Sequence, residues 1–266
     1  MHPVDHLFVL LLVMAQPIYG VIEARWQEAR AQAGEPLNRI RFYRQTQAME
    51  WTFAACLGCA WFLLARPVED LGLVRPGGTR FWIGTVLLLL LTVVLTHSWW
   101  TATKTSASDK AGQVHALGKL VRYVPQTAAE LRSFIAVSMT AGIVEEIVYR
   151  GFLIWYFEQY MPLWSAVVAS SIAFTLGHGY QGVSGASRCG LLGLAFALYY
   201  VFTGSIWLPI IAHALLDALQ GAALYELLRN DRDELNPQAA QPGCQHLGPK
   251  TSETKSPGQK PATPLG

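Results

Sequence analysis

The chain has 266 residues, of which 52% are hydrophobic and only 14% carry a charge. Soluble domains usually carry about 25% charged residues, so this composition excludes an ordinary soluble domain and indicates a membrane protein. The formal net charge of +2 is small and gives no reason to expect nucleic-acid binding.

Seven apolar runs occupy most of the first 229 residues, and aromatic residues gather at several of their ends. A transmembrane helix needs roughly 20 mainly apolar residues, with about 17 as the lower limit, and aromatic residues are typical of its interfacial ends. In chain order the runs are Val4–Ile22, Ala48–Ala65, Phe81–Trp100, Phe134–Phe157, Pro162–His178, Cys189–Thr203 and Ser205–Leu228. The sequence therefore predicts an all-α, polytopic membrane helix bundle of about seven transmembrane helices, forming an integral membrane domain over residues 1–229.

Basic residues indicate the orientation of this bundle, because cytoplasmic loops carry an excess of Lys and Arg. Two segments are basic, one after the first run and one before the fourth: Arg25, Arg30, Arg39, Arg41 and Arg44, and then Lys104, Lys110, Lys119, Arg122 and Arg132. We therefore expect the N-terminus outside and the C-terminus in the cytoplasm. Residues 230–266 are rich in Pro, Gln, Thr, Lys and Gly, and this composition predicts a disordered cytoplasmic tail.

The connection before the fourth run carries two local signals. Gln113–Tyr123 has apolar residues on one helical face, which predicts a helix lying on the inner membrane surface. An ordinary solvated loop is the alternative. Thr127 and Glu130 have the spacing of a capping box, so the fourth helix is predicted to begin there.

Charged residues inside the fourth run point to function. Ionisable groups within a membrane are costly and mark functional sites by default, and this run contains Glu145, Glu146 and Arg150. Glu146 and Arg150 are four residues apart, so they share one helical face in the order that favours an ion pair. Glu145 lies about 100° around the helix from Glu146. One glutamate therefore has a partner, and the other is available for chemistry.

Imidazoles and a further carboxyl are predicted at compatible depths. His178 ends the fifth run, His213 lies within the seventh, and Asp217 follows His213 by four residues on the same face. A carboxylate beside an imidazole can deprotonate a water, and a second imidazole can stabilise the oxyanion that forms when water attacks an amide. These residues predict peptide hydrolysis without a covalent intermediate, inside a cavity open to the cytoplasm.

Other chemistry remains open for the same residues. Glu with two His is a known zinc ligand set, although a compact H-E-x-x-H pattern is missing from the sequence. A proton-coupled transporter is a further alternative, because Glu and His chains also relay protons. We expect neither a cofactor nor a metal ion at the site.

Three motifs on successive predicted helices resemble those of one protein family. EEIVYR at residues 145–150 is similar to E-E-x-x-x-R, FTLGH at residues 174–178 to F-x-x-x-H, and HALLD at residues 213–217 to H-x-x-x-[N/D]. Together they resemble the CPBP family, which includes CAAX prenyl proteases of the Rce1 type and bacterial proteins for bacteriocin processing or self-immunity. The resemblance covers roughly residues 130–225.

The resemblance implies a glutamic-type intramembrane endopeptidase with its catalytic residues on the last four helices. By this comparison Glu145 is the base that activates water, His178 helps to hold that water and His213 stabilises the oxyanion. Glu146 and Arg150 position the site. The substrate is expected to be a membrane-anchored or lipid-modified protein or peptide, and membrane lipid is the other expected partner. A bacterial inner (plasma) membrane is the expected location.

Asp217 departs from the prenyl-protease pattern, which has Asn at this position. An ionised aspartate cannot donate a hydrogen bond, so Asp217 is either protonated or orients His213. The departure weakens the inference that the substrate is prenylated. A non-enzymatic bacteriocin self-immunity binding protein and a zinc-dependent intramembrane protease are the alternative functions.

Overall fold

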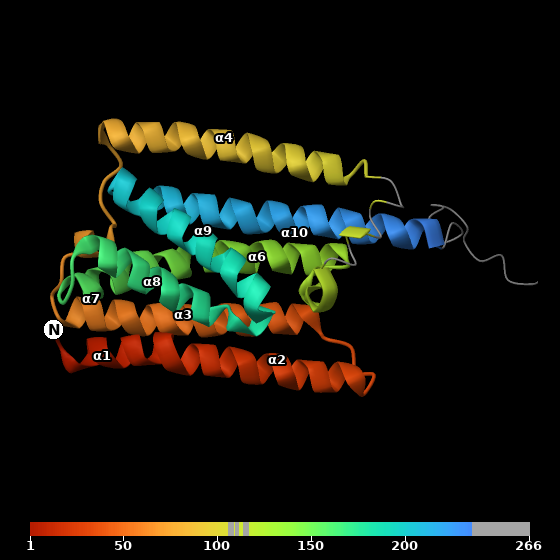
Figure 1. The fold of residues 1–266 in the computed structure, drawn as a ribbon, viewed down its shortest axis with the longest axis horizontal. Helices are drawn as coiled ribbons and strands as arrows, with labels where there is room; N and C mark the ends of the chain where they lie inside the picture. Colours follow the sequence, from red (N-terminus) through yellow and green to blue (C-terminus); the bar gives the residue numbers. More distant parts are fainter. Residues whose placement is uncertain (106–108, 110–111, 114–116, 236–266) are drawn as a thin grey trace, which may run out of the picture.

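The computed structural model describes residues 1–105, 109, 112–113 and 117–235, and the regular elements within these residues are all helical. Figure 1 shows most of the long helices lying side by side along a common direction. In chain order they are α1 (Pro3–Leu10), η1 (Leu11–Ala15), α2 (Gln16–Gln32), α3 (Arg39–Leu63), η2 (Val68–Leu71), α4 (Gly78–Ala102), η3 (Gly118–Tyr123), α6 (Ala128–Glu145), η4 (Glu146–Leu153), α7 (Ile154–Glu158), α8 (Leu163–Gly177), η5 (Gly179–Gln181), α9 (Gly182–Thr203) and α10 (Trp207–Leu235). The predicted all-α fold is confirmed. Helix α10 extends to Leu235, and residues 236–266 of the expected tail lie outside the described part.

Within the described residues, four helical stretches are long and apolar enough to cross a membrane. They are Pro3–Gln32, Gly78–Ala102, Gly179–Thr203 and Trp207–Arg229, and the shorter Leu163–Gly177 is also apolar. Exposed aliphatic side chains on α4, including Leu89 and Val93, suit contact with lipid.

The predicted count of seven spans is not confirmed. Each of the seven runs is helical over most of its length, but α3 opens with several arginines and α6 with η4 contains the charged motif residues. Charge within a helix lowers its hydropathy, so length and composition alone do not identify these two as spans. Among the described residues there are therefore four candidate spans, and the remaining helices pack beside them.

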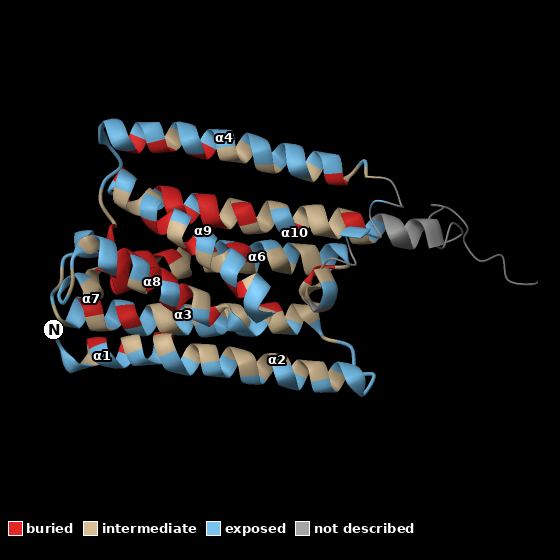
Figure 2. Ribbon diagram, in the orientation of Figure 1, coloured by how far each residue is buried: buried red, intermediate tan, exposed pale blue. Residues whose placement is uncertain are grey.

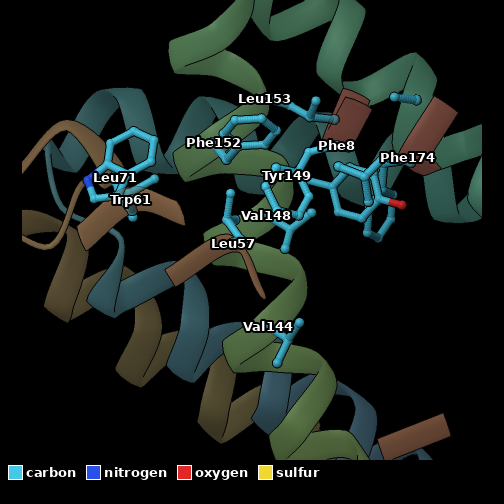
Figure 3. Close-up of a cluster of buried hydrophobic side chains, with 12 residues drawn as sticks. Phe8, Leu57, Trp61, Leu71, Val144, Val148, Tyr149, Phe152, Leu153 and Phe174 are labelled. Carbon is cyan, nitrogen blue, oxygen red and sulfur yellow. The ribbon is translucent and has the colours of Figure 1, made fainter. Parts of the chain in front are cut away.

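A buried core surrounds the continuous helical stretch formed by α6, η4 and α7. Figure 2 shows buried residues concentrated on the helices around this stretch, whereas α2 has no buried residue. Figure 3 shows core side chains from α1, α3, η2, α6, η4 and α8, among them Phe8, Leu57, Trp61, Leu71, Val144, Val148, Tyr149, Phe152, Leu153 and Phe174. Lipid tails are as apolar as these side chains, so close packing is what holds such helices together in a membrane.

One end of the bundle is tied together by a buried ion pair. Arg66, just after α3, donates two hydrogen bonds of 2.7 and 2.8 Å to the carboxylate of Asp5 in α1. The same guanidinium lies 5.1 Å from the ring centre of Trp61 and 4.8 Å from that of Trp155. Cation–π contacts of this kind help to offset the loss of hydration, so this end of α1, α3 and α7 is held in register.

The opposite end contains the connection that precedes α6. The predicted capping box is confirmed, because Thr127 accepts from the Glu130 backbone N–H while Glu130 accepts from that of Thr127. The predicted surface α-helix is not found at its C-terminal part, where Gly118–Tyr123 is a 3₁₀ helix. Residues 114–116 lie outside the described part. The phenol of Tyr43 donates a 2.6 Å hydrogen bond to the carbonyl of Tyr123, so this turn is fastened to α3.

Candidate active site

The two motif glutamates lie where an α-helix becomes a π-helix. Glu145 is the last residue of α6, and Glu146 opens the π-helical stretch η4. π-Helical turns are rare and frequently occur at functional sites. The carbonyl of Tyr149 within this stretch accepts a 2.5 Å hydrogen bond from the Ser170 hydroxyl of α8. Ser170 therefore supplies a donor to the altered backbone.

Glu146 and Arg150 form the predicted ion pair in the buried interior. Nη1 of Arg150 lies 2.9 Å from Oε1 of Glu146, and the two side chains are 1% and 0% exposed. Nη2 of Arg150 donates a 3.0 Å hydrogen bond to the carbonyl of Gly193 in α9. The guanidinium also lies 4.4 Å from the ring centre of Phe174. Arg150 therefore connects η4 to both α8 and α9.

His213 connects the glutamate pair to α10, a link that the sequence did not reveal. Its Nδ1 lies 2.7 Å from Oε1 of Glu146, and a carboxylate can only accept, so Nδ1 is the donor. Its Nε2 lies 3.9 Å from Oε2 of Glu145 and 3.6 Å from Oδ2 of Asp217. The ring stacks on Phe196 with centres 5.2 Å apart. One nitrogen is thus anchored by Glu146, and the other faces Glu145.

His178 has an equally defined orientation. Its Nδ1 lies 2.9 Å from the carbonyl oxygen of Phe174, which can only accept. Nδ1 therefore donates, and in the neutral ring Nε2 is left as an acceptor. The Phe174 ring packs against His178 with centres 4.4 Å apart, and the Arg150 guanidinium also lies 4.4 Å from the centre of this ring. This double contact explains the phenylalanine of the F-x-x-x-H motif in physical terms.

The functional side chains face a cavity of about 370 Å³ enclosed by α3, η3, α6, α8, η5, α9 and α10. Glu145, His178, His213 and Asp217 line it, whereas Glu146 and Arg150 lie behind it and do not. The six predicted residues therefore form one constellation in two layers. The front layer can contact a bound molecule, and the rear layer holds the front layer in place.

Two smaller cavities also reach Glu145. One of about 250 Å³ is lined mostly by apolar residues of η1, α3, α6 and η4, including Leu12, Phe53 and Val148. The other, of about 180 Å³, is more polar and lies between α2, α3 and η3. Glu145 thus borders one apolar cavity and one more polar cavity.

Glu50 of α3 lines all three of these cavities together with Glu145. Sequence reasoning missed it, although the same signal that identified Glu145 was present, namely an ionisable residue within a predicted span. Asp217 was expected either to be protonated or to orient His213. Its side chain is 36% exposed, and its Oδ2 lies 3.6 Å from Nε2 of His213, whereas Glu146 holds Nδ1 of the same ring.

The side chains around the cavity include possible metal ligands. Within the described residues, no three His, Cys, Asp or Glu side chains are grouped closely enough to hold an ion. In addition, Nδ1 of His213 is engaged by Glu146. Glu145, His178 and His213 therefore do not form a preformed zinc site in this structure.

Comparison with known proteins identifies the segment that carries this constellation. Residues 127–219 match the family model described as type II CAAX prenyl endopeptidase Rce1-like. Searches of the curated proteins and of the solved structures returned no significant match. The matched segment begins at the N-cap of α6 and contains all six predicted site residues. The resemblance drawn from the three motifs is confirmed, because this family model matches the segment in which all three motifs lie.

Proposed function

We propose that this protein is a glutamic-type intramembrane endopeptidase that hydrolyses peptide bonds with a water activated by Glu145. The observation that carries the proposal is the shared cavity, in which Glu145, His178 and Nε2 of His213 face one space. The membrane-spanning helices and the CAAX protease family support hydrolysis at a membrane.

The reaction follows from the atoms that face the cavity. Glu145 accepts a proton from a water molecule while the oxygen of that water attacks the carbonyl carbon of the peptide bond. The second O–H of the water donates a hydrogen bond to Nε2 of His178. Nε2–H of His213 donates to the oxyanion that forms. Glu145 then passes its proton to the leaving nitrogen as the C–N bond breaks, giving a carboxyl and an amine product.

The second layer gives His213 its required proton arrangement. Stabilising an oxyanion requires a proton on Nε2, and Nδ1 already donates to Glu146. In the imidazolium form of His213 both nitrogens carry a proton. The carboxylate of Glu146 at Nδ1 stabilises this form, as a carboxylate does in other hydrolases. Arg150 in turn holds Glu146. In this proposal Glu146 and Arg150 position the oxyanion donor without contacting substrate.

The cavities suggest a class of substrate. The apolar cavity beside Glu145 suits an acyl or isoprenoid chain or an apolar side chain, and the more polar one suits a peptide backbone. A peptide anchored in the membrane would place its scissile bond between them. We propose a membrane-anchored or lipid-modified peptide, with the site open toward the cytoplasm, where the basic loop residues are expected to lie.

The test compares membranes of cells that carry the wild-type protein or Glu145→Gln. We expect at least one membrane protein to lose a processed terminus in Glu145→Gln, as seen by mass spectrometry of protein termini. The matched control is Glu226→Gln, a carboxyl on α10 outside the cavities that pairs with Arg229. Identical termini in wild type and Glu145→Gln would refute the proposal and favour a non-catalytic binding protein.

A chelator provides the second arm of this test. If Glu145 activates water directly, substrate processing in isolated membranes should continue in the presence of a strong chelator. Loss of processing that returns on addition of Zn²⁺ would replace this mechanism with a metal-assisted one.

A further inference from the structure

Glu50 lies in the middle of α3, outside the segment that matches the protease family. Helix α3 runs beside α6 in a well-defined register. Gln47 and Trp51 each donate a 3.2 Å hydrogen bond to the hydroxyl of Thr140 in α6. Glu50 is on this same side of α3, and it lines each of the three cavities that Glu145 lines. The two carboxyl groups therefore face the same space from neighbouring helices.

The carboxyl group of Glu50 has an unused position for a hydrogen bond. Its Oε2 is buried and has no hydrogen-bond partner among the described residues. The buried carboxylates of Asp5 and Glu146 are each paired with an arginine. No Lys or Arg of the described chain lines the three cavities. An unpaired carboxylate in such surroundings would be very costly, whereas a carboxylic acid is neutral and can donate one hydrogen bond.

The other ionisable groups around Glu50 are mostly acidic. Glu23 of α2, Glu145 of α6 and Asp217 of α10 share cavities with it, and the imidazoles are His178 and His213. The other titratable side chains that line these cavities are tyrosines and Cys189. A further negative charge on Glu50 would repel the three acids, so the neutral form fits this arrangement.

Glu145 lacks a donor of the kind that Glu50 can supply. Among the described residues its nearest charged partner is Nε2 of His213 at 3.9 Å, which is too long for a hydrogen bond. Asp217 likewise only approaches this nitrogen, at 3.6 Å, whereas Glu146 and Arg150 pair with each other. His213 bonds to Glu146, and His178 bonds to the Phe174 carbonyl. A water-activating carboxylate needs a defined orientation to be efficient.

We propose that Glu50 is a positioning residue of this active site, a protonated carboxylic acid on α3 that donates a hydrogen bond to the carboxylate of Glu145, directly or through one cavity water. The inference rests on the proposed role of Glu145 as the base. It adds a helix outside the family segment to the catalytic machinery. The oxygen of Glu145 that accepts from Glu50 is thereby held still, and the other oxygen is turned toward the attacking water.

Infrared difference spectroscopy of the purified protein tests the hydrogen bond without a substrate. We expect a band from a protonated carboxyl group that disappears in Glu50→Gln. The band should shift in Glu145→Gln, because an amide is a weaker acceptor than a carboxylate, and remain unchanged in Glu226→Gln. A missing band, or one that Glu145→Gln leaves in place, would overturn the proposal.

The second measurement is proteolytic activity. Its substrate is the membrane protein whose terminus is processed in wild type but not in Glu145→Gln. Glu50→Leu removes the donor at similar volume and should lower kcat at least tenfold with little change in KM and in melting temperature. Glu50→Gln keeps an N–H donor and should stay within about threefold of wild type, as expected for replacement of one neutral donor by another.

The outcomes separate this inference from the proposed function. Wild-type kcat in Glu50→Leu, or equal loss in Glu50→Gln and Glu50→Leu, would overturn the role of Glu50 while leaving that of Glu145 intact. Normal processing in Glu145→Gln would instead refute the proposed function. The infrared experiment would then still test the hydrogen bond between Glu50 and Glu145. Should Glu50→Leu fail to fold, Glu50→Gln and the infrared band still decide.

Discussion

Replacing Arg150 with methionine tests the central ion pair against two pairs that differ in burial. The side chains of Arg150 and Glu146 are 1% and 0% exposed, those of Arg66 and Asp5 are 15% and 2% exposed, and those of Arg229 and Glu226 are 50% and 15% exposed. Methionine keeps much of the length of the arginine stem but removes the charge. The three substitutions Arg150→Met, Arg66→Met and Arg229→Met therefore form a series in which burial is the main variable.

The expected losses follow from what each substitution leaves unpaired. Arg150→Met leaves a buried Glu146 carboxylate, and breaking such a pair typically costs about 3–5 kcal/mol. The carbonyl of Gly193 also loses its donor, a cost of about 1–3 kcal/mol that is not simply additive with the first. His213 remains bonded to Glu146 and limits the total, so we expect about 3–5 kcal/mol. Arg229→Met should cost less than about 1 kcal/mol, with Arg66→Met between the two.

The measurement is unfolding of the purified proteins in mixed micelles with increasing SDS, followed by tryptophan fluorescence. Processing activity is measured on the same samples. We expect Arg150→Met to lower both stability and activity, because Glu146 then holds His213 less firmly. If Arg150→Met is destabilised no more than Arg229→Met, the buried pair does not hold the site together and the reasoning is wrong.

Two further substitutions probe the front and the framework of the site. Asp217→Asn should keep most activity, because Glu146 holds Nδ1 of His213 and an amide can still donate. A loss at every pH that approaches the roughly 10⁴-fold effect of replacing an orienting aspartate would contradict this. Gly142→Ala should lower stability by about 1–3 kcal/mol and reduce activity, because a Cβ there would lie 2.8 Å from the backbone nitrogen of Ala214. Its matched control, Gly58→Ala on the exposed side of α3, meets no atom within 4 Å and should be neutral or slightly stabilising in an unfolding assay.

The sequence by itself determined the features that depend on neighbouring residues along the chain. Composition and apolar runs identified an all-helical membrane protein, because spanning a bilayer demands long apolar helices. The Glu146–Arg150 pair and the Thr127–Glu130 capping box were predictable because residues three or four apart meet on any helix. The roles of the site residues came from motif resemblance, and the family match supports the motifs while the individual roles stay predictions.

Only the tertiary structure decided which side chains meet across helices. The bond between His213 and Glu146, the contact of Phe174 with Arg150 and the approach of Glu50 to the cavity of Glu145 all join separate helices. Such contacts depend on the rotation and axial register of each helix, and a change of one residue in register turns a side chain by about 100°. The π-helical turn at Glu146 shifts this rotation within the motif itself. The periodicity of apolar residues predicts which side chains avoid water or contact lipid, but it does not predict which partner each polar group has in the folded protein.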